Sequence, residues 1–247
     1  MGSIHAGKLV SLPPQFSLPL PQSTAYSADD FAVSASNSYA HEYIMRWPDW
    51  AQPVLVLQGS TAAGKTHLAH IWAAQSDACF IDPQQLTRNT VRELIEQGGA
   101  AQAWVVDGIA AIADEAALFH LLNAVREQHG WLLLTSDIPP VQMDIPLADL
   151  RSRLCAAPLV SLQPPDDAAL AAVIVKQFAD RQLRVSDDVV QYLLRRMDRS
   201  FAAARQWVQR MDEAALARQS KITVRLIRQL MDEEEKPIAG NGSLLPK

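Results

Sequence analysis

The chain has 247 residues, 49% of them hydrophobic, and a formal net charge of −5. The length suits one large or two smaller domains with a sizeable core, and the acidic balance argues against a dedicated nucleic-acid binder. No apolar run reaches membrane-spanning length, so no membrane association is expected. Cys79 and Cys155 are too few for a disulfide framework and are predicted to be reduced core residues of a cytoplasmic protein.

The first segment, residues 1–24, is rich in Pro, Ser and Gln and is expected to be a flexible, extended tail. It contains a hexapeptide with apolar anchors: Gln15, Phe16, Ser17, Leu18, Pro19 and Leu20. Prolines favour an extended backbone, which lowers the entropy cost of docking. The hexapeptide resembles the motif by which bacterial replication proteins bind the sliding clamp, although Phe16 stands where Leu is usual. A solvated proline-rich tail is the alternative.

An aromatic segment follows the tail. Tyr26, Phe31 and Val33 precede a predicted helix over 38–47, which Pro48 ends. In P-loop proteins with an adenine site, a segment of this kind wraps the base, and these three side chains are candidates for an apolar sandwich around it. They are equally well explained as anchors of the first helix on a sheet.

The most specific motif is a glycine-rich loop between a short apolar run, 54–57, and a helical pattern, 67–74. This is the context of a phosphate-binding P-loop. The glycines let backbone N–H groups turn toward an anion, and the lysine brings a charge to the β- and γ-phosphates. The predicted nucleotide-binding residues are Gly59, Ser60, Thr61, Ala62, Ala63, Gly64, Lys65, Thr66 and His67.

Two further strands are predicted before the middle of the chain. Residues 79–82 form the first, and a helix is expected from Pro83 to about Gln97. The run 103–106 then ends in Asp107, as a central parallel strand does. Asp107 is predicted to hold Mg²⁺ together with the hydroxyl of Thr66.

One position departs from an active ATPase. The residue after the first acid is commonly a second acid that orients the attacking water, and this chain has Gly108. Asp114 and Glu115 lie nearby but are expected in the first turn of a helix over 115–129. Weak intrinsic hydrolysis is therefore predicted.

A fourth strand, 131–134, leads to two hydroxyls, Thr135 and Ser136, which either sense the γ-phosphate or cap the strand. A short helix, 147–154, then precedes a fifth strand, 159–162. Arg151 and Arg153 are two residues apart on this helix, so they point in different directions. We predict Arg153 as an arginine finger for a neighbouring subunit's nucleotide and Arg151 as structural, with two surface arginines as the alternative.

The carboxyl-terminal region is predicted to be helical. Apolar periodicity and start signals give helices over 166–181, 187–198, 200–219 and 223–234. The expected organisation is a tail over 1–24, an α/β nucleotide-binding domain over 25–163, a small all-α lid over 164–235 and a disordered tail over 236–247.

The hexapeptide, residues 28–31, the P-loop, residues 134–137 and residues 150–153 together resemble the Hda family, AAA+ regulatory inactivators of the replication initiator DnaA, in an alphaproteobacterial style. The resemblance implies a P-loop NTPase fold with a five-stranded parallel sheet, flanking helices and a lid. It implies bound ADP or ATP with Mg²⁺. The sensor 2 arginine of the family would align near Ala202, so this chain departs from the pattern there, and Arg199 is preferred over Arg205 as its substitute.

The same resemblance implies two partners, the sliding clamp (the β subunit of DNA polymerase III) and DnaA, whose hydrolysis of ATP the chain would stimulate to prevent re-initiation of replication. A homo-oligomer is possible, and no sequence-specific DNA binding is expected. The alternatives are an AAA+ ATPase that loads a helicase or remodels a protein, and a DnaA-core paralogue that acts only by mixed oligomerisation.

Overall fold

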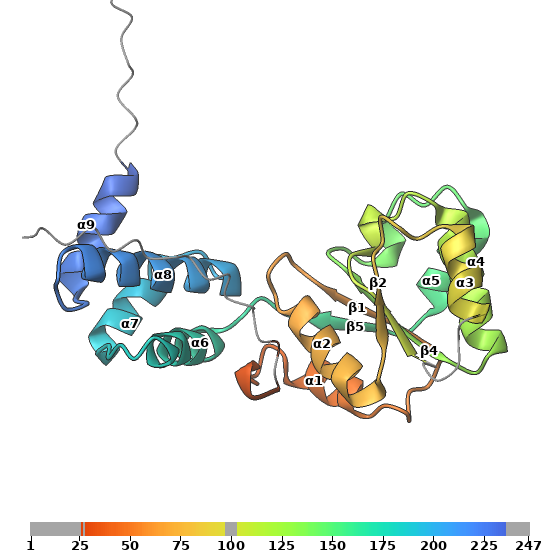
Figure 1. Ribbon diagram of the computed structural model, residues 1–247, viewed down its shortest axis with the longest axis horizontal. Coiled ribbons are helices and arrows are strands. Elements are labelled where there is room, and N and C mark those ends of the chain that lie inside the picture. The colour runs from red at the N-terminus through yellow and green to blue at the C-terminus, as the bar shows by residue number, and fades with distance from the viewer. Residues whose placement is uncertain (1–25, 27, 97–102, 236–247) are drawn as a thin grey trace, which may run out of the picture.

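The computed structural model describes residues 26, 28–96 and 103–235, which form an α/β domain followed by a helical domain (Figure 1). The strands are β1 (Val54–Gly59), β2 (Cys79–Ile81), β3 (Ala103–Val106), β4 (Trp131–Ser136) and β5 (Leu159–Leu162). The helices of the α/β domain are α1 (Ser38–Met45), α2 (Lys65–Ser76), α3 (Arg88–Glu96), α4 (Glu115–Glu127) and α5 (Ala148–Ala156), with short 3₁₀ turns η1 (Ala28–Asp30), η2 (Ile109–Ala111) and η3 (Pro140–Gln142). The helical domain consists of α6 (Asp167–Asp180), α7 (Asp187–Leu194), α8 (Phe201–Ala217) and α9 (Val224–Glu235).

Within the described residues, the strands form one five-stranded parallel sheet in the order β2-β3-β4-β1-β5. This confirms the predicted fold class. β1 is central, with Val54 opposite Leu132 of β4 and Val56 opposite Leu159 of β5. Because all strands run the same way, the loops after β1, β3 and β4 leave the sheet at one edge. The P-loop and the carboxylates of Asp107 and Asp137 therefore meet there.

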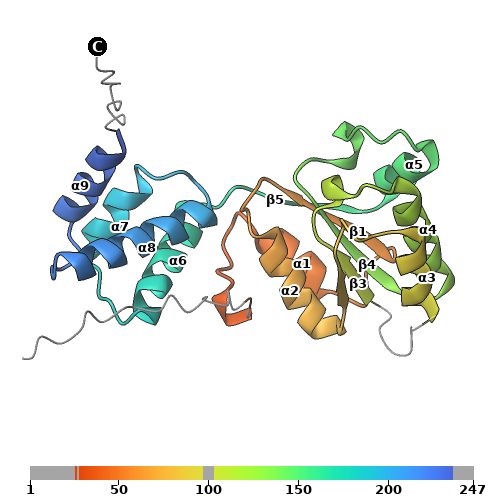
Figure 2. The same cartoon turned by 45° about the horizontal axis from the view of Figure 1, so that its top comes forward.

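The alternation of side chains along each strand supplies two apolar faces. Val54 and Val56 of β1 pack into a core with residues of α3, α4 and α5. Leu55 and Leu57 point to the other face and pack with residues of α1 and α2. Residues 54–57 of β1 and 131–134 of β4 are continuous apolar runs, as in buried parallel strands, because helices cover both faces of the sheet (Figure 2).

The helical domain has a core of its own, formed by α6 to α9 around buried residues such as Phe178, Trp207 and Met211. Ser200 caps α8 by accepting a hydrogen bond from the Ala203 N–H at 3.1 Å. Each lid helix was predicted within a few residues of its observed bounds. None of the described helices is both long and apolar enough to cross a membrane.

Asp166 joins the two domains. Its Oδ1 accepts a hydrogen bond from the Ala169 N–H at 2.8 Å and so caps α6, while its Oδ2 accepts from the Ser36 N–H at 3.3 Å. The Gln163 N–H also donates to the Ser36 carbonyl at 3.2 Å. The hydrogen bond from the Ala169 N–H is the main reason why the pKa of Asp166 lies below its ordinary value.

Two local predictions are wrong. The helix expected from Pro83 begins five residues later, at Arg88, because Asp82 holds a turn: its Oδ1 accepts from the Gln84 N–H at 2.9 Å. Cys79 and Cys155 are exposed rather than buried, since Cys79 lies on the edge strand β2 and Cys155 on the outer side of α5.

Candidate functional site: a P-loop cleft between two domains

The P-loop turns sharply between β1 and α2. Ala62 and Gly64 both have positive φ, 60° and 103°, and α2 begins at Lys65. A Cβ at position 64 would also lie 3.5 Å from the Phe201 ring of the lid. That contact is ordinary van der Waals packing, so it is the positive φ that would strain a side chain there and that favours glycine. The loop ends at the positive N-terminus of α2, where an anion is favoured.

Lys65 is buried, with all three hydrogen-bond donors of its ammonium group engaged. Its Nζ donates to the carbonyls of Gly59 and Ser60, at 2.8 and 2.9 Å, and to Oδ1 of Asp137 at 2.6 Å. The other carboxylate oxygen of Asp137 accepts from the Thr61 hydroxyl at 3.2 Å. The P-loop therefore holds the Lys65 ammonium group in place, and this group pairs with the carboxylate of Asp137 at the end of β4.

Asp107 lies beside the P-loop, as a magnesium-binding acid should. The Thr66 hydroxyl donates to its Oδ2 at 2.7 Å, and the Thr135 hydroxyl donates to its Oδ1 at 2.5 Å. Thr135 is fully buried and accepts in turn from the Gly108 N–H at 2.8 Å. Its hydroxyl is thus directed at Asp107, while the buried Ser136 hydroxyl donates to the Ile138 carbonyl at 2.6 Å.

Mg²⁺ that binds nucleotide phosphates takes only one or two direct ligands from the protein, and Asp107 and Thr66 are suited to this role. No cluster of three metal-binding side chains occurs among the residues that the structure describes, so a metal held by protein side chains alone is not indicated there. Gly108 adopts φ 88°, in the left-handed region. An acidic residue in its place would be strained, and the backbone is therefore shaped for glycine rather than for a second acid.

Aromatic side chains of the α/β domain stand next to the P-loop. The His67 ring packs edge-on against Tyr26 and Phe31, with centroids 5.5 and 5.2 Å apart. Tyr26 is also stacked on His70 at 4.3 Å, and His70 is stacked on Phe80 at 4.2 Å. Burial lowers the pKa of His70, which favours the neutral ring in this stack.

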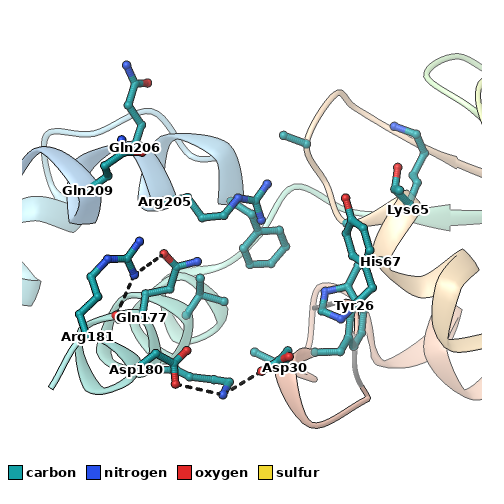
Figure 3. A pocket seen from close by; sticks show the side chains of 18 residues that line it. Tyr26, Asp30, Lys65, His67, Gln177, Asp180, Arg181, Arg205, Gln206 and Gln209 are labelled. Atoms are coloured by element: carbon teal, nitrogen blue, oxygen red, sulfur yellow. Dashed lines mark hydrogen bonds and ion pairs between the residues drawn. The ribbon is translucent and has the colours of Figure 1, made fainter. Parts of the chain in front are cut away.

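The lid faces these groups across a cavity of about 850 Å³, a size ordinary for small-molecule sites. Its polar lid residues come from α6 and α8, and Figure 3 shows Arg205 and Gln177 extending toward the side of Lys65, His67 and Tyr26. Lys176 of α6 also pairs with Asp30 of η1, Nζ to Oδ1, at 2.8 Å. The lining residues are Tyr26, Asp30, Phe31, Ala32, Ala62, Gly64, Lys65, Thr66, His67, Val173, Lys176, Gln177, Asp180, Arg181, Phe201, Arg205, Gln206 and Gln209.

Seven of the thirteen predicted nucleotide-binding residues line this cavity: Tyr26, Phe31, Ala62, Gly64, Lys65, Thr66 and His67. The other six are absent from the lining: Gly59, Ser60, Thr61, Ala63, Val33 and Arg199. Val33 is 55% exposed and is absent from the lining, whereas Tyr26 and Phe31 line it. Arg199, our preferred sensor 2 residue, pairs with Asp167 at 2.9 Å between Nη1 and Oδ1 and also lies outside the lining. Arg205, the less preferred alternative, is the arginine of α8 that reaches the cavity.

The candidate finger lies elsewhere. α5 is on the side of the α/β domain away from the lid (Figures 1 and 2), so Arg153 does not face this chain's own cavity. The Arg153 guanidinium lies over the Phe119 ring of α4 at 4.8 Å, while Arg151 is exposed. Arg153 is therefore the arginine packed on another side chain and Arg151 the exposed one, while the role of Arg153 as a finger stays a prediction. The hexapeptide over 15–20 lies outside the described residues.

Sequence reasoning missed Asp137 and the lid side of the cavity. Asp137 follows β4 as Asp107 follows β3, and carboxyl ends of neighbouring parallel strands meet, so a signal existed for it. Gln177, Arg181 and Lys176 gave no such signal, because their place depends on how the two domains pack.

Comparison with known proteins identifies the lid. Residues 166–231 match the family model described as the Hda lid domain. This range spans α6 to α9 almost completely. Together with the DnaA-like fold described next, the match confirms the predicted resemblance to the Hda family.

Solved structures share the fold over most of this chain at low sequence identity. Domain III of the Thermotoga maritima replication initiation protein DnaA aligns with a TM-score of 0.70 and 17% identity over 88% of this chain and all of that chain. DnaA from Aquifex aeolicus bound to AMPPCP has a TM-score of 0.65 and 16% identity, covering 86% and 69%. The Thermotoga maritima RuvB branch migration motor has a TM-score of 0.67 and 16% identity, covering 84% and 72%. These likenesses establish the AAA+ fold.

Proposed function

We propose that this chain binds an adenine nucleotide and regulates the replication initiator DnaA. The proposal is based on its DnaA-like AAA+ fold and its Hda-type lid domain. The observation that carries the proposal is the cleft, in which a complete P-loop and a magnesium-type acid face an Hda-type lid. The AMPPCP bound by the DnaA of similar fold supports an adenine nucleotide, ADP or ATP, as the ligand.

Residues of both domains contact the bound nucleotide. The P-loop N–H groups and Lys65 hold the phosphates, while Thr66 and Asp107 hold Mg²⁺. Tyr26, Phe31 and His67 supply aromatic surface for the base. Arg205 reaches in from α8 and acts as the lid's phosphate sensor in place of Arg199.

The chain acts as an adaptor with weak hydrolysis of its own. Gly108 offers no carboxylate next to Asp107, and Asp114 is used as a helix cap, accepting from the Ala117 N–H at 3.0 Å. Glu115 accepts from the Leu147 N–H at 2.9 Å, which draws its carboxylate toward α5. Neither acid is therefore available to orient a water at the P-loop.

Arg153 serves as the arginine finger for ATP bound to DnaA. Its place on α5, remote from this chain's own cleft, suits a role in trans, and stacking on Phe119 limits the conformations of its long side chain. A pre-ordered guanidinium loses less entropy when it engages a triphosphate. Fingers of this kind accelerate hydrolysis by about 10³-fold or more.

The hexapeptide, residues 15–20, docks the chain on the sliding clamp, the β subunit of DNA polymerase III, in the cytoplasm where the chromosome is replicated. Docking raises the local concentration of Arg153 near DnaA on the same DNA. Hydrolysis leaves DnaA in its ADP form and so prevents re-initiation. Bound nucleotide sets the chain's own oligomeric state.

The testing experiment measures hydrolysis of ATP on purified DnaA with this chain, with and without clamp loaded on DNA. Arg153→Ala is expected to remove the stimulation while nucleotide and clamp binding remain. Arg151→Ala is the matched control, since it is an exposed arginine on the same helix, and it is expected to retain stimulation. Equal stimulation by the wild type and Arg153→Ala would assign the finger elsewhere.

A second candidate function is an ATPase that loads a helicase or remodels a protein. The ordered set of Thr66, Asp107 and Thr135 favours it, because that set suits magnesium-dependent chemistry within this chain. Strong turnover by the purified chain alone, abolished by Lys65→Ala, would support this candidate over the regulator. Deleting residues 1–22 separates a third possibility, mixed oligomerisation with DnaA, because that mode does not need the tail.

A further inference from the structure

Four exposed arginines gather on the lid where α7 and α9 meet. Arg195 and Arg196 directly follow α7, while Arg225 and Arg228 lie in the first half of α9. The two helices are in contact, and Figures 1 and 2 show α9 at the end of the helical domain that is remote from the α/β domain. None of the four arginines lines the nucleotide cavity, so the group, which we name the α7–α9 arginine patch, is a separate surface.

Tyr192 of α7 holds two of these side chains. The Arg196 guanidinium lies over the Tyr192 ring, 3.8 Å from its centroid. A hydrogen bond to the Tyr192 hydroxyl raises the pKa of Arg228 above its ordinary value. Arg225 precedes Arg228 by three residues, so the two are neighbours on the surface of α9. Because the ring limits the conformations of two guanidinium groups, they lose less entropy when they engage an anion.

Ion pairs do not neutralise the patch. In the part of the chain that the structure describes, no carboxylate lies within ion-pair distance of any of its four arginines. The acids closest to them in sequence are Asp198 and Asp232, and Asp232 acts on Arg228 only through its charge. By contrast, Arg199 pairs with Asp167 at 2.9 Å. A surface that keeps positive charges side by side, in a chain whose net charge is −5, is suited to a polyanion.

The composition of the patch favours the backbone of duplex nucleic acid over an acidic protein. Protein interfaces usually bury an apolar centre, and among the described residues of α7 and α9 no large hydrophobic side chain is exposed. Phosphate contacts need only charge and donors, and a guanidinium group can donate two hydrogen bonds to one phosphate. Single strands usually stack their bases on aromatic rings, but Arg196 already covers the ring of Tyr192.

We infer that the α7–α9 arginine patch is a contact site for the phosphate backbone of duplex DNA, bound without sequence preference. The site goes beyond the proposed function, since it requires neither a nucleotide nor another protein. The patch and α5 lie in different domains, so DNA at the patch leaves Arg153 uncovered. Phosphate contacts carry no sequence information, which agrees with the small number of charges in the patch.

The test is fluorescence anisotropy of a labelled duplex of arbitrary sequence, titrated with the full chain alone at several KCl concentrations between about 50 and 200 mM. Each phosphate contact contributes about −0.9 to the slope of the logarithm of the binding constant against the logarithm of the salt concentration, so four contacts give about −3.6. Replacing Arg196 and Arg228 together by alanine should weaken binding at the lowest salt by about tenfold and make the slope shallower by about two.

Two further double variants keep the test specific. Replacing Arg195 and Arg225 by alanine removes two patch charges without touching the contacts of Tyr192, and it should change the slope equally. The control replaces Arg88 and Arg92, two exposed arginines of α3, and should bind DNA as the wild type does. Circular dichroism establishes that each variant is folded.

Absence of binding by the wild type up to about 100 μM chain would overturn the inference, because even non-specific DNA binding is usually tighter than that. An unchanged slope in both patch variants, or an equal loss in the α3 control, would overturn it as well. Neither result bears on nucleotide binding or on DnaA, which the experiments under the proposed function measure separately.

Discussion

Replacing Asp166 with alanine is expected to loosen the lid. The carboxylate caps α6 through the Ala169 N–H at 2.8 Å and accepts across the domain boundary from the Ser36 N–H at 3.3 Å. Losing an N-cap costs about 1 kcal/mol, and losing the longer bond about 0.5 kcal/mol more. The free energy of unfolding of the lid should therefore fall by roughly 1.5 kcal/mol, as measured by urea denaturation followed by tryptophan fluorescence.

Two variants make the reasoning specific. Asp167→Ala removes a first-turn carboxylate of α6 and its pair with Arg199, in which both side chains are more than half exposed, so its cost is expected to stay at about 0.5 kcal/mol, below that of Asp166→Ala. Asp166→Asn retains a good cap but removes the charge. If Asp166→Ala proved as stable as the wild type, or no less stable than Asp167→Ala, the proposed role of the cap and the domain contact would be refuted.

The same site fixes a pH dependence. The Ala169 hydrogen bond holds the pKa of Asp166 below its ordinary value of 3.8, so the ionised form stabilises the folded state. That contribution is complete above the ordinary pKa and is lost as the pH falls through the lower folded pKa. The stability advantage of the wild type over Asp166→Asn should accordingly shrink below about pH 4.

Three further predictions concern the cleft. Thr135→Val removes the 2.5 Å hydrogen bond that orients the carboxylate of Asp107. Titration should show nucleotide affinity about tenfold weaker in Mg²⁺ but much less weakened in EDTA. Equal losses under both conditions would contradict a role of Thr135 in orienting Asp107 for Mg²⁺. Arg205→Ala should weaken nucleotide binding by about fivefold or more and Arg199→Ala by less than twofold, because Arg205 lines the cavity and Arg199 does not; the reverse order would restore Arg199 as the sensor. Gly108→Asp should lower the free energy of unfolding by about 1–2 kcal/mol without raising ATP turnover, since φ is 88° there; a gain in turnover would refute the account of weak hydrolysis.

The parts of the fold that could be predicted follow from local patterns. The apolar runs that precede the P-loop and Asp107 predicted strands β1 and β3. The glycine-rich loop predicted the phosphate-binding site, because a P-loop is built from consecutive residues. Asp166 and Ser200 marked the starts of two lid helices, which their observed caps confirm.

Most of what could not be predicted depends on residues far apart in the chain, and one missed feature is local. Pro83 suggested a helix start, but the side chain of Asp82 stabilises a turn there instead. Arg199 and Arg205 are six residues apart, and only the packing of the lid against the α/β domain decides which one reaches the cavity. The exposure of Cys79 follows from the place of β2 at the sheet edge, which no local pattern reports.

The most direct test of the regulatory role is the rate at which DnaA-bound ATP is hydrolysed when this chain and clamp-loaded DNA are both present. We predict stimulation that requires the clamp and is abolished by Arg153→Ala but not by Arg151→Ala. Stimulation that persisted without Arg153, or no stimulation by the folded, nucleotide-loaded chain, would contradict the proposal that its guanidinium acts on the triphosphate of DnaA.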